Sequence, residues 1–362
     1  MKRSWIANCA AALVGLLPQA GAATEGEAPA AATEAKAVGE FGYEARRPIM
    51  GAACPTCVWG PFAVVTKRIM EPLGWDLQIC WNCNAADSPR FVAGARVPHD
   101  LRPDEIKIGA LPPPKGPVDF GVTTERALRW AYDGLYEYAG DGPQPQLRLI
   151  ANFEDPNFLA MASRRELGIS NLAEIRERRL PVRLHTTIEN DALVQPILEY
   201  YGLTEDQLSS WGGKIVTREE AMRDGVDVLI HRNASVSQNM ESQIWTWATH
   251  KYDMQFYTLP NDLRETLIEK LGYNPVTMPV GYFRGVEEAI PTLEFSGQVV
   301  YGRDDMPEEF AYQLAKAMDR NRGEYLWSIR PFMLDPNRVW KAGKVPLHPG
   351  AERFYREAGY IE

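Results

Sequence analysis

The sequence predicts an α/β fold made of two domains of ordinary size. Short apolar segments alternate with amphipathic helical segments, which favours parallel sheets with helices on both faces. Several helical segments carry start and stop signals, and a chain of 362 residues is long enough for two hydrophobic cores. In sheets of this kind ligands bind beyond the carboxyl ends of the strands, so the loops after the strands matter most.

The strands are predicted from short apolar runs that turn residues bound on either side. They cover residues 48–53, 75–80, 118–122, 147–153, 157–161, 181–185 and 226–230. The segments at 147–153 and 157–161 are expected near a crossover of the chain.

The helices are predicted from apolar periodicity and from capping residues. A first helix is expected at about residues 60–70. Asn171 with Glu174, and Thr217 with Glu220, have the spacing of capping boxes at two further helix starts. Asp224-Gly225 is expected to end the second of these.

Two other helices have a clear apolar face. One is expected to kink at Pro196 and to stop at Gly202, and its face is Leu193, Ile197, Leu198 and Tyr201. The other is expected to be capped by Asp304 or Asp305, with Pro307 in its first turn; its face is Phe310, Leu314, Ala317 and Met318.

The N-terminal segment is typical of a secretory signal. Lys2 and Arg3 precede an apolar run over residues 5–17 that is too short to span a bilayer, and Ala20-Gly21-Ala22 is a small-residue cleavage site. We therefore expect residues 1–22 to be a signal peptide and the mature protein to be periplasmic. Residues 23–42, rich in Ala and Glu, are expected to form a flexible linker.

Charge and motifs exclude several classes of function. The chain has 39 basic and 48 acidic residues, a net charge of −9, and no basic run, which argues against binding to nucleic acid or to an anionic membrane. The sequence has no Ser-His-Asp order, zinc-protease motif, phosphate loop or dinucleotide fingerprint. We therefore expect a binding protein with no catalytic residue, no cofactor and no metal, and we expect a monomer.

Three segments in the second half of the chain carry a family resemblance. They are Met-Pro-Val-Gly-Tyr-Phe-Arg-Gly at 278–285 followed by Ile290-Pro291-Thr292, Val-Pro-Leu-His-Pro-Gly-Ala at 345–351 followed by Tyr-Arg-Glu-Ala-Gly at 355–359, and Asp-Gly-Val-Asp at 224–227. In these segments the chain resembles the TAXI-type solute receptors of tripartite ATP-independent periplasmic (TRAP) transporters.

The resemblance implies a type II periplasmic binding fold, with two α/β lobes joined by a two-strand hinge and a ligand cleft between them. Lobe 1 would comprise residues 43–149 and 291–362, and lobe 2 residues 150–290. The ligand would be a small carboxylate, an amino acid or an aromatic acid, and the partner a TRAP-type membrane permease. Three loops after the predicted strands depart from the glycine-rich family pattern. Cysteines stand in the loops at 51–57 and 80–84, and His-Thr-Thr-Ile-Glu-Asn at 185–190 stands where the family has Gly-Ser-Gly-Thr.

Four cysteines form two Cys-x-x-Cys pairs, Cys54 with Cys57 and Cys80 with Cys83. The oxidising periplasm favours disulfides, while a metal site and thiol redox chemistry remain the alternatives. The two loops should lie side by side, so we expect bridges across the loops, which close a longer stretch of chain than bridges within each motif.

The candidate ligand-binding residues follow the predicted strands. They are Trp59, Trp81, Asn82, Asn84, Thr123, Thr124, His185, Thr186, Thr187, Arg232, Asn233 and Tyr282. Trp59 and Trp81 are expected to stack on a planar ligand or else to pack in the core. His185 with the two threonines can hold a carboxylate, unless Thr187 caps a helix. Arg232 is the candidate carboxylate clamp, and a surface ion pair is its alternative.

Overall fold

The computed structural model describes residues 42–51, 58–83, 87–96, 98, 116–154, 157–186, 194–236, 242–294, 297–326 and 332–362. The predicted signal peptide and all but the last residue of the predicted linker lie outside this range. Within it, no helix is long and apolar enough to cross a membrane.

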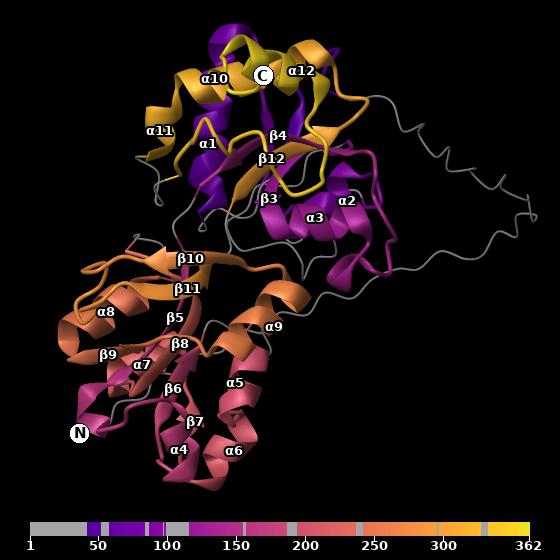
Figure 1. Ribbon diagram of the computed structural model, residues 1–362. Coiled ribbons are helices and arrows are strands. Elements are labelled where there is room, and N and C mark those ends of the chain that lie inside the picture. Colours follow the sequence, from indigo (N-terminus) through magenta and orange to yellow (C-terminus); the bar gives the residue numbers. More distant parts are fainter. Residues whose placement is uncertain are drawn as a thin grey trace, which may run out of the picture. The chain divides into compact units, whose positions relative to one another are not determined.

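The first sheet has five strands in the order β2-β1-β3-β12-β4. Figure 1 labels β3, β12 and β4 of this sheet. Their bounds are Gln78–Cys80 for β2, Ile49–Gly51 for β1, Phe120–Thr124 for β3, Gln298–Arg303 for β12 and Leu147–Phe153 for β4. Strand β1 is parallel to β2 and β3, whereas β12 is antiparallel to both of its neighbours.

The second sheet repeats this plan with strands in the order β7-β6-β8-β5-β9. Their bounds are Lys214–Ile215 for β7, Arg183–Thr186 for β6, Val228–Ala234 for β8, Phe158–Arg164 for β5 and Met254–Tyr257 for β9. Strand β6 is parallel to β7 and β8, and β5 is antiparallel to β8 and β9. A separate antiparallel pair joins β10 (Asn274–Met278) to β11 (Ile290–Glu294).

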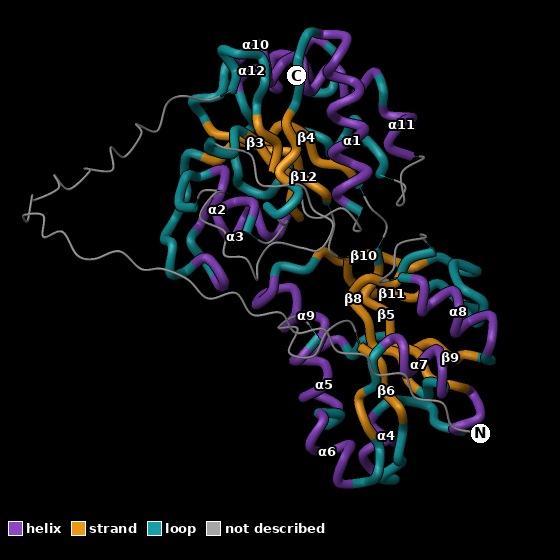
Figure 2. The backbone as a smooth tube through the Cα atoms, turned by 180° about the vertical axis from the view of Figure 1, so that it is seen from behind, coloured by secondary structure: helices purple, strands orange, loops and turns teal. Residues whose placement is uncertain are grey.

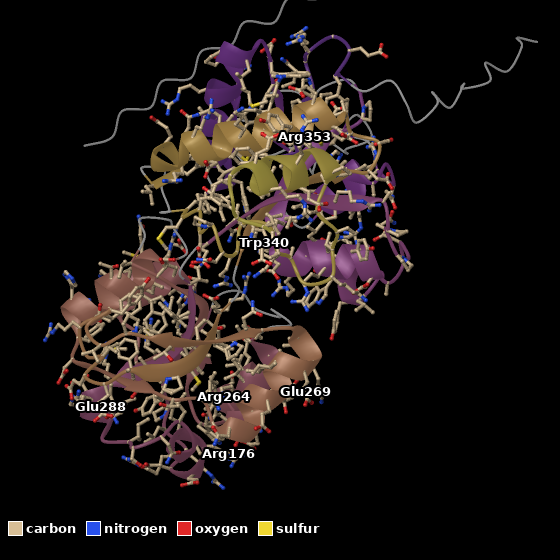
Figure 3. The ribbon with its side chains drawn as sticks, turned by 45° about the horizontal axis from the view of Figure 1, so that its top comes forward. Arg176, Arg264, Glu269, Glu288, Trp340 and Arg353 are labelled. Atoms are coloured by element: carbon tan, nitrogen blue, oxygen red, sulfur yellow. A yellow bond between two sulfur atoms is a disulfide. The ribbon has the colours of Figure 1, made fainter. Side chains whose placement is uncertain are left out.

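Helices cover both faces of each sheet, as Figure 2 shows for the purple segments around the orange strands. The helices are α1 (Trp59–Met70), α2 (Ser88–Val92), α3 (Glu125–Asp133), α4 (Ala173–Glu177), α5 (Gln195–Tyr201), α6 (Glu205–Ser210), α7 (Arg218–Asp224), α8 (Gln243–Lys251), α9 (Asn261–Leu271), α10 (Glu308–Arg320), α11 (Arg322–Leu326) and α12 (Pro349–Glu357). Their apolar faces are buried, whereas charged side chains such as Arg176, Glu269, Glu288 and Arg353 are exposed (Figure 3).

The α/β class predicted from the sequence is confirmed, and two mixed five-stranded sheets of this order are the arrangement of the type II periplasmic binding fold. The expectation of wholly parallel sheets is wrong by one strand in each. The exceptions are β5 and β12, which are the strands that follow the connections between the two halves of the chain. Each enters its sheet directly from the other half, without the helical crossover that a strand parallel to its neighbour needs. The predicted lobe boundaries stay a prediction.

The strand register shows at which edge of each sheet β5 and β12 begin. Phe158, which begins β5, pairs with Ala234 at the carboxyl end of β8. Gln298, which begins β12, pairs with Thr124 and Phe153 at the carboxyl ends of β3 and β4. The connections from β4 to β5 and from β11 to β12 therefore lie at the carboxyl edges of the sheets.

Several predicted helix signals are confirmed. The Thr217–Glu220 capping box forms in full, with the Glu220 N–H donating to the Thr217 hydroxyl and the Thr217 N–H donating to the Glu220 carboxylate. Gly202 ends α5 in the left-handed conformation, with φ 66°. Helix α7 ends at Asp224, directly before Gly225.

Three other signals are corrected. Pro196 does not kink α5, because the helix begins at Gln195 and its first turn needs no donor from the proline nitrogen. The Asn171–Glu174 box does not form, because the Glu174 carboxylate accepts from the N–H and the hydroxyl of Ser170 instead. Neither Asp304 nor Asp305 caps α10, whose N-cap position is Pro307. The two aspartates pair with Arg148 and Arg303 respectively.

Candidate functional site

The carboxyl edge of the first sheet carries four of the predicted ligand residues. Trp81 and Asn82 follow β2 directly, and Thr123 and Thr124 are the last two residues of β3. Because β1, β2 and β3 are parallel, their ends meet at this edge. Asn82 and Thr123 are buried, and Trp81 is partly buried. The Thr124 hydroxyl accepts from the Ala127 N–H at 3.1 Å and so caps α3.

The loop after β2 is closed by a disulfide between Cys80 and Cys83, and both residues are buried. The Cα atoms of the pair are 5.4 Å apart, within the ordinary range for a disulfide. A tight turn brings them together, with the Cys83 N–H donating to the Cys80 carbonyl at 3.4 Å. The expected bridge across the loops is therefore wrong for this pair, because the turn closes the bond locally.

This pairing also bears on the metal alternative. A sulfur in a disulfide is not a thiolate, so Cys80 and Cys83 in this state hold no metal ion. Cys54 and Cys57 lie outside the described residues, as do Asn84 and Thr187, so their predicted roles stay predictions. Among the described residues no cluster of three or more His, Cys, Asp or Glu side chains has the arrangement of a metal site.

Trp59 packs in the core of the first sheet. It is the first residue of α1, it is buried, and its ring stacks on Phe332 with centroids 6.4 Å apart. Phe332 also meets Phe62 edge to face at 5.1 Å. These contacts favour the packing role for Trp59 over the ligand-stacking role.

The carboxyl edge of the second sheet carries four more of the predicted residues, and Tyr282 contacts the segment that follows β8. His185 and Thr186 end β6 and are buried. Arg232 and Asn233 were expected in a loop, but they lie inside β8, which continues to Ala234 because its end pairs with β5. The partly buried Tyr282 accepts from the Val236 N–H at 3.4 Å, and its ring meets Phe158 at 4.8 Å.

Two neutral histidines lie together on one face of this sheet. The His185 and His231 rings are 5.5 Å apart, and His185 Nδ1 bonds the Val216 carbonyl at 2.8 Å. Burial lowers the pKa of His185, and burial together with the neighbouring His185 holds the pKa of His231 well below its usual range. Neither ring therefore supplies positive charge to an anion at neutral pH.

Sequence reasoning missed Trp245, which lies in the first turn of α8 and is fully buried. Its ring meets His231 edge to face, with centroids 6.3 Å apart. Among the described residues, Trp245 Nε1, His231 Nδ1 and the Thr186 hydroxyl have no hydrogen-bond partner. Buried polar atoms without partners are costly and rare. The sequence around Trp245 shows only helical periodicity, which gives no sign of this.

Arg338 is a second residue that the sequence did not single out. Its guanidinium lies 2.7 Å from Glu154, which follows β4, and 3.8 Å from Glu294, which ends β11. One side chain thus contacts both connections between the sheets. The sequence shows no pattern that would predict these contacts, because Arg338 is far from both glutamates along the chain.

A profile of the NMT1-like family matches residues 114–359, well over half of the sequence. The chain belongs to the NMT1-like family.

Solved structures of solute-binding proteins are also similar to this member of the NMT1-like family, at low identity. A TctC solute-binding protein from Polaromonas is 8% identical, with 79% of this chain and 89% of that chain covered and a TM-score of 0.43. MatC from Rhodopseudomonas palustris with bound malate is 11% identical, with 87% and 98% covered and a TM-score of 0.40. A TRAP periplasmic solute-binding protein from Ralstonia eutropha H16 with bound (S)-2-acetolactate is 10% identical, with 87% and 85% covered and a TM-score of 0.34.

Proposed function

We propose that the protein is a periplasmic solute-binding receptor of the TAXI type, which binds a small organic ligand and delivers it to a TRAP-type membrane permease. The register of the two connections carries the proposal. Both connections lie at the carboxyl edges of the sheets, where the candidate ligand residues also lie. A chain that passes twice between two α/β sheets at these edges has the geometry of a hinge beside a ligand site.

The ligand that this site suits best carries a carboxylate. Arg232 offers a planar two-pronged donor, and Thr186, His231 and Trp245 offer neutral polar atoms for the rest of the molecule. A carboxylate, an amino acid or an aromatic acid suits this set, in which both histidines are neutral and Arg232 is the positive group.

A thermal-shift screen of small carboxylates, amino acids and aromatic acids tests the proposal. A ligand at one hundred times its Kd stabilises a binding protein by about 2.7 kcal/mol, which such a screen detects readily. A receptor function would be contradicted if no compound in the full set stabilised the protein and the protein converted any one of them to a product.

Arg232→Lys tests the clamp once a ligand is found. Lysine keeps the charge but loses the two parallel hydrogen bonds, so affinity should fall by about tenfold in calorimetry. Arg353→Lys is the matched control, because Arg353 is an exposed arginine that pairs with Glu309 at 2.9 Å. Equal affinity in the two variants would return Arg232 to the role of a surface charge.

A further inference from the structure

A pocket of about 310 Å³ lies on the face of the second sheet that α4, α5 and α9 cover. Its walls are three tyrosines together with small polar and apolar residues; the lining set is Ser170, Asn171, Leu172, Ala173, Tyr200, Tyr201, Tyr257, Thr258 and Pro260. Its volume is at the lower limit of ordinary small-molecule sites. Thr258 and Pro260 follow β9, and the other lining residues come from β9 itself, from the start of α4 with the residues just before it, and from the end of α5. The lining set shares no residue with the predicted ligand-binding set.

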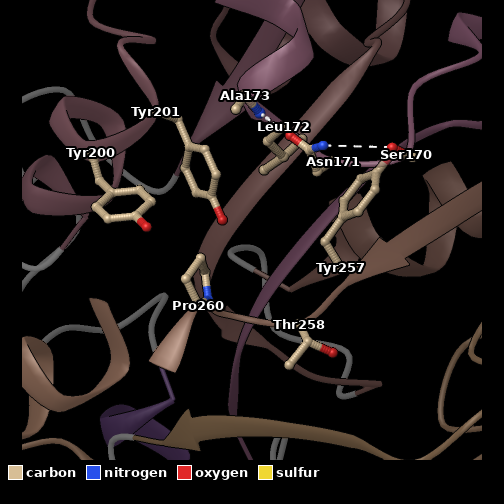
Figure 4. A pocket seen from close by; sticks show the side chains of 9 residues that line it. All are labelled: Ser170, Asn171, Leu172, Ala173, Tyr200, Tyr201, Tyr257, Thr258 and Pro260. Carbon is tan, nitrogen blue, oxygen red and sulfur yellow. Dashed lines mark hydrogen bonds between the residues drawn. The ribbon is translucent and has the colours of Figure 1, made fainter. Parts of the chain in front are cut away.

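The tyrosines present aromatic surface from different directions. Figure 4 shows Tyr201 and Tyr257 on two sides of the space, with Leu172 between them and Pro260 opposite. The rings of Tyr200 and Tyr201 are nearly perpendicular, at 79°, with centroids 5.1 Å apart. Tyr201 and Tyr257 thus flank the space, and Tyr200 packs edge to face against Tyr201. The faces of aromatic rings attract cations.

Tyr201 contributes an unused polar group. It is only 5% exposed, and among the described residues its hydroxyl has no hydrogen-bond partner. In Figure 4 that hydroxyl points into the space above Pro260. Burial raises the pKa of Tyr201 to about 12, so the phenol is neutral at physiological pH. By contrast, the Tyr257 hydroxyl is already bonded to the Ser163 hydroxyl at 2.7 Å.

Two carboxylates, Asp262 and Glu174, lie beside the pocket. The Tyr200 hydroxyl donates to Asp262 at 3.2 Å, which adds electron density to the ring. Glu174 accepts from the Ser170 N–H and hydroxyl at 2.8 and 2.6 Å, and these bonds lower the pKa of its carboxyl. No Lys or Arg is among the lining residues. Two arginines act from outside the lining set. Arg178 contacts Glu174 at 3.5 Å. Burial raises the pKa of Tyr257, and the charge of Arg165 lowers it.

We propose that this pocket binds a small organic cation of the quaternary ammonium or protonated amine class, at a site separate from the carboxyl-edge ligand site. The rings of Tyr201 and Tyr257 flank the cationic head, and Tyr200 extends the aromatic wall beside Tyr201. Asp262 and Glu174 favour the charge from the rim. The Tyr201 hydroxyl donates to a polar group carried by the same ligand.

Calorimetry with choline and with its neutral isostere 3,3-dimethyl-1-butanol tests the charge requirement on the full mature chain. Choline should bind at least tenfold more tightly, because the isostere has the same shape without the charge. Equal binding of the two compounds, or no binding of either choline or tetramethylammonium, would overturn the proposal.

Tyr200→Leu tests the place of binding. Tyr200 is 42% exposed, so its loss should leave the fold intact while choline affinity falls about tenfold. Tyr200→Phe keeps the ring and should retain most of the affinity. Tyr360→Leu is the matched control, because Tyr360 also donates to an aspartate, Asp319, at 2.7 Å, but belongs to the first-sheet region. Equal affinity in Tyr200→Leu and Tyr360→Leu would locate the cation elsewhere and contradict the proposal, whereas Arg232→Lys should leave choline binding unchanged.

Discussion

Asp119 in the first sheet and Asp227 in the second occupy equivalent positions. Asp119 directly precedes β3, and its carboxylate accepts from the Ile49 N–H at the start of β1 at 2.6 Å. Asp227 lies next to the start of β8, and its carboxylate accepts from the Arg183 N–H at the start of β6 at 2.8 Å. In both sheets one aspartate therefore fixes the register of the central parallel pair.

The surroundings of the two aspartates differ. Asp227 lies 3.7 Å from the Arg164 guanidinium, which also covers the ring of Tyr252. Asp119 is 1% exposed and is bonded mainly to backbone N–H groups, and burial raises its pKa to about 7. One topological requirement is thus met by an ion pair in one sheet and by a desolvated carboxyl in the other. Equal strand order therefore does not require equal electrostatic surroundings at equivalent positions.

The largest expected effect is the pH dependence that Asp119 gives to the stability. Between its unfolded pKa near 3.8 and its folded pKa of about 7, the folded state holds a proton that the unfolded state releases. This contribution is fully present below about pH 4 and is lost as pH rises through 7, a total of about 4 kcal/mol. Urea unfolding from pH 4 to 8 should show a flatter profile for Asp119→Asn than for the wild type.

Asp227→Asn is the control for that comparison. It removes the equivalent bond in the second sheet, so stability should fall without loss of the slope between pH 4 and 7. If the free energy of unfolding of Asp119→Asn and that of the wild type change equally with pH, the raised pKa of Asp119 is contradicted.

The second expected effect concerns the disulfide of the first sheet, which the described part of the second sheet lacks. Cys80→Ala with Cys83→Ala should lower the free energy of unfolding by about 2 kcal/mol, because a bridge over so short a loop removes little entropy from the unfolded chain. Urea unfolding with and without reductant measures it. Reductant should destabilise the wild type more than the double variant; equal sensitivity would mean that this bridge contributes no stability.

The sequence predicts the fold better than it predicts the site, and particular residues show why. Apolar periodicity places β4 at Leu147–Phe153 and the Thr217–Glu220 capping box correctly, because both depend on neighbours in the chain. The antiparallel direction of β5 and β12 depends instead on the sheet from which the chain arrives. The pattern of neighbouring residues contains no information about that sheet.

The site depends even more on distant neighbours. His185 could be proposed from its place at a strand end, but its neutrality comes from burial beside His231, and Trp245 comes from another helix. Arg338 contacts glutamates on two separate connections. The Cys-x-x-Cys spacing indicates a disulfide, whereas the choice of partner depends on how tightly the loop turns.

The smallest expected effect is a change in stability at His231, one of the buried polar groups of the second sheet. His231 is buried and its Nδ1 has no partner among the described residues, so the ring costs stability that a ligand could restore. His231→Leu should raise the free energy of unfolding at pH 7 by about 1 kcal/mol while it weakens ligand binding. The lowered pKa of His231 also makes the stability of the wild type depend on pH. As pH falls below the unfolded pKa of 6.5, the unfolded state takes up a proton that the folded state does not, so the free energy of unfolding decreases. The variant lacks this group and should lose less stability in acid.

His348 of the first-sheet region is the matched control for this change. It is equally buried, but both of its ring nitrogens are bonded, to the Met306 carbonyl at 3.1 Å and to the Gly350 N–H at 3.2 Å. His348→Leu leaves those two groups unpaired and should lower stability by about 2 kcal/mol, with ligand affinity unchanged. Urea unfolding and calorimetry on both variants give the answer. A loss of stability in both would mean that His231 is a structural residue like His348, and that its unpaired nitrogen is not kept for a ligand.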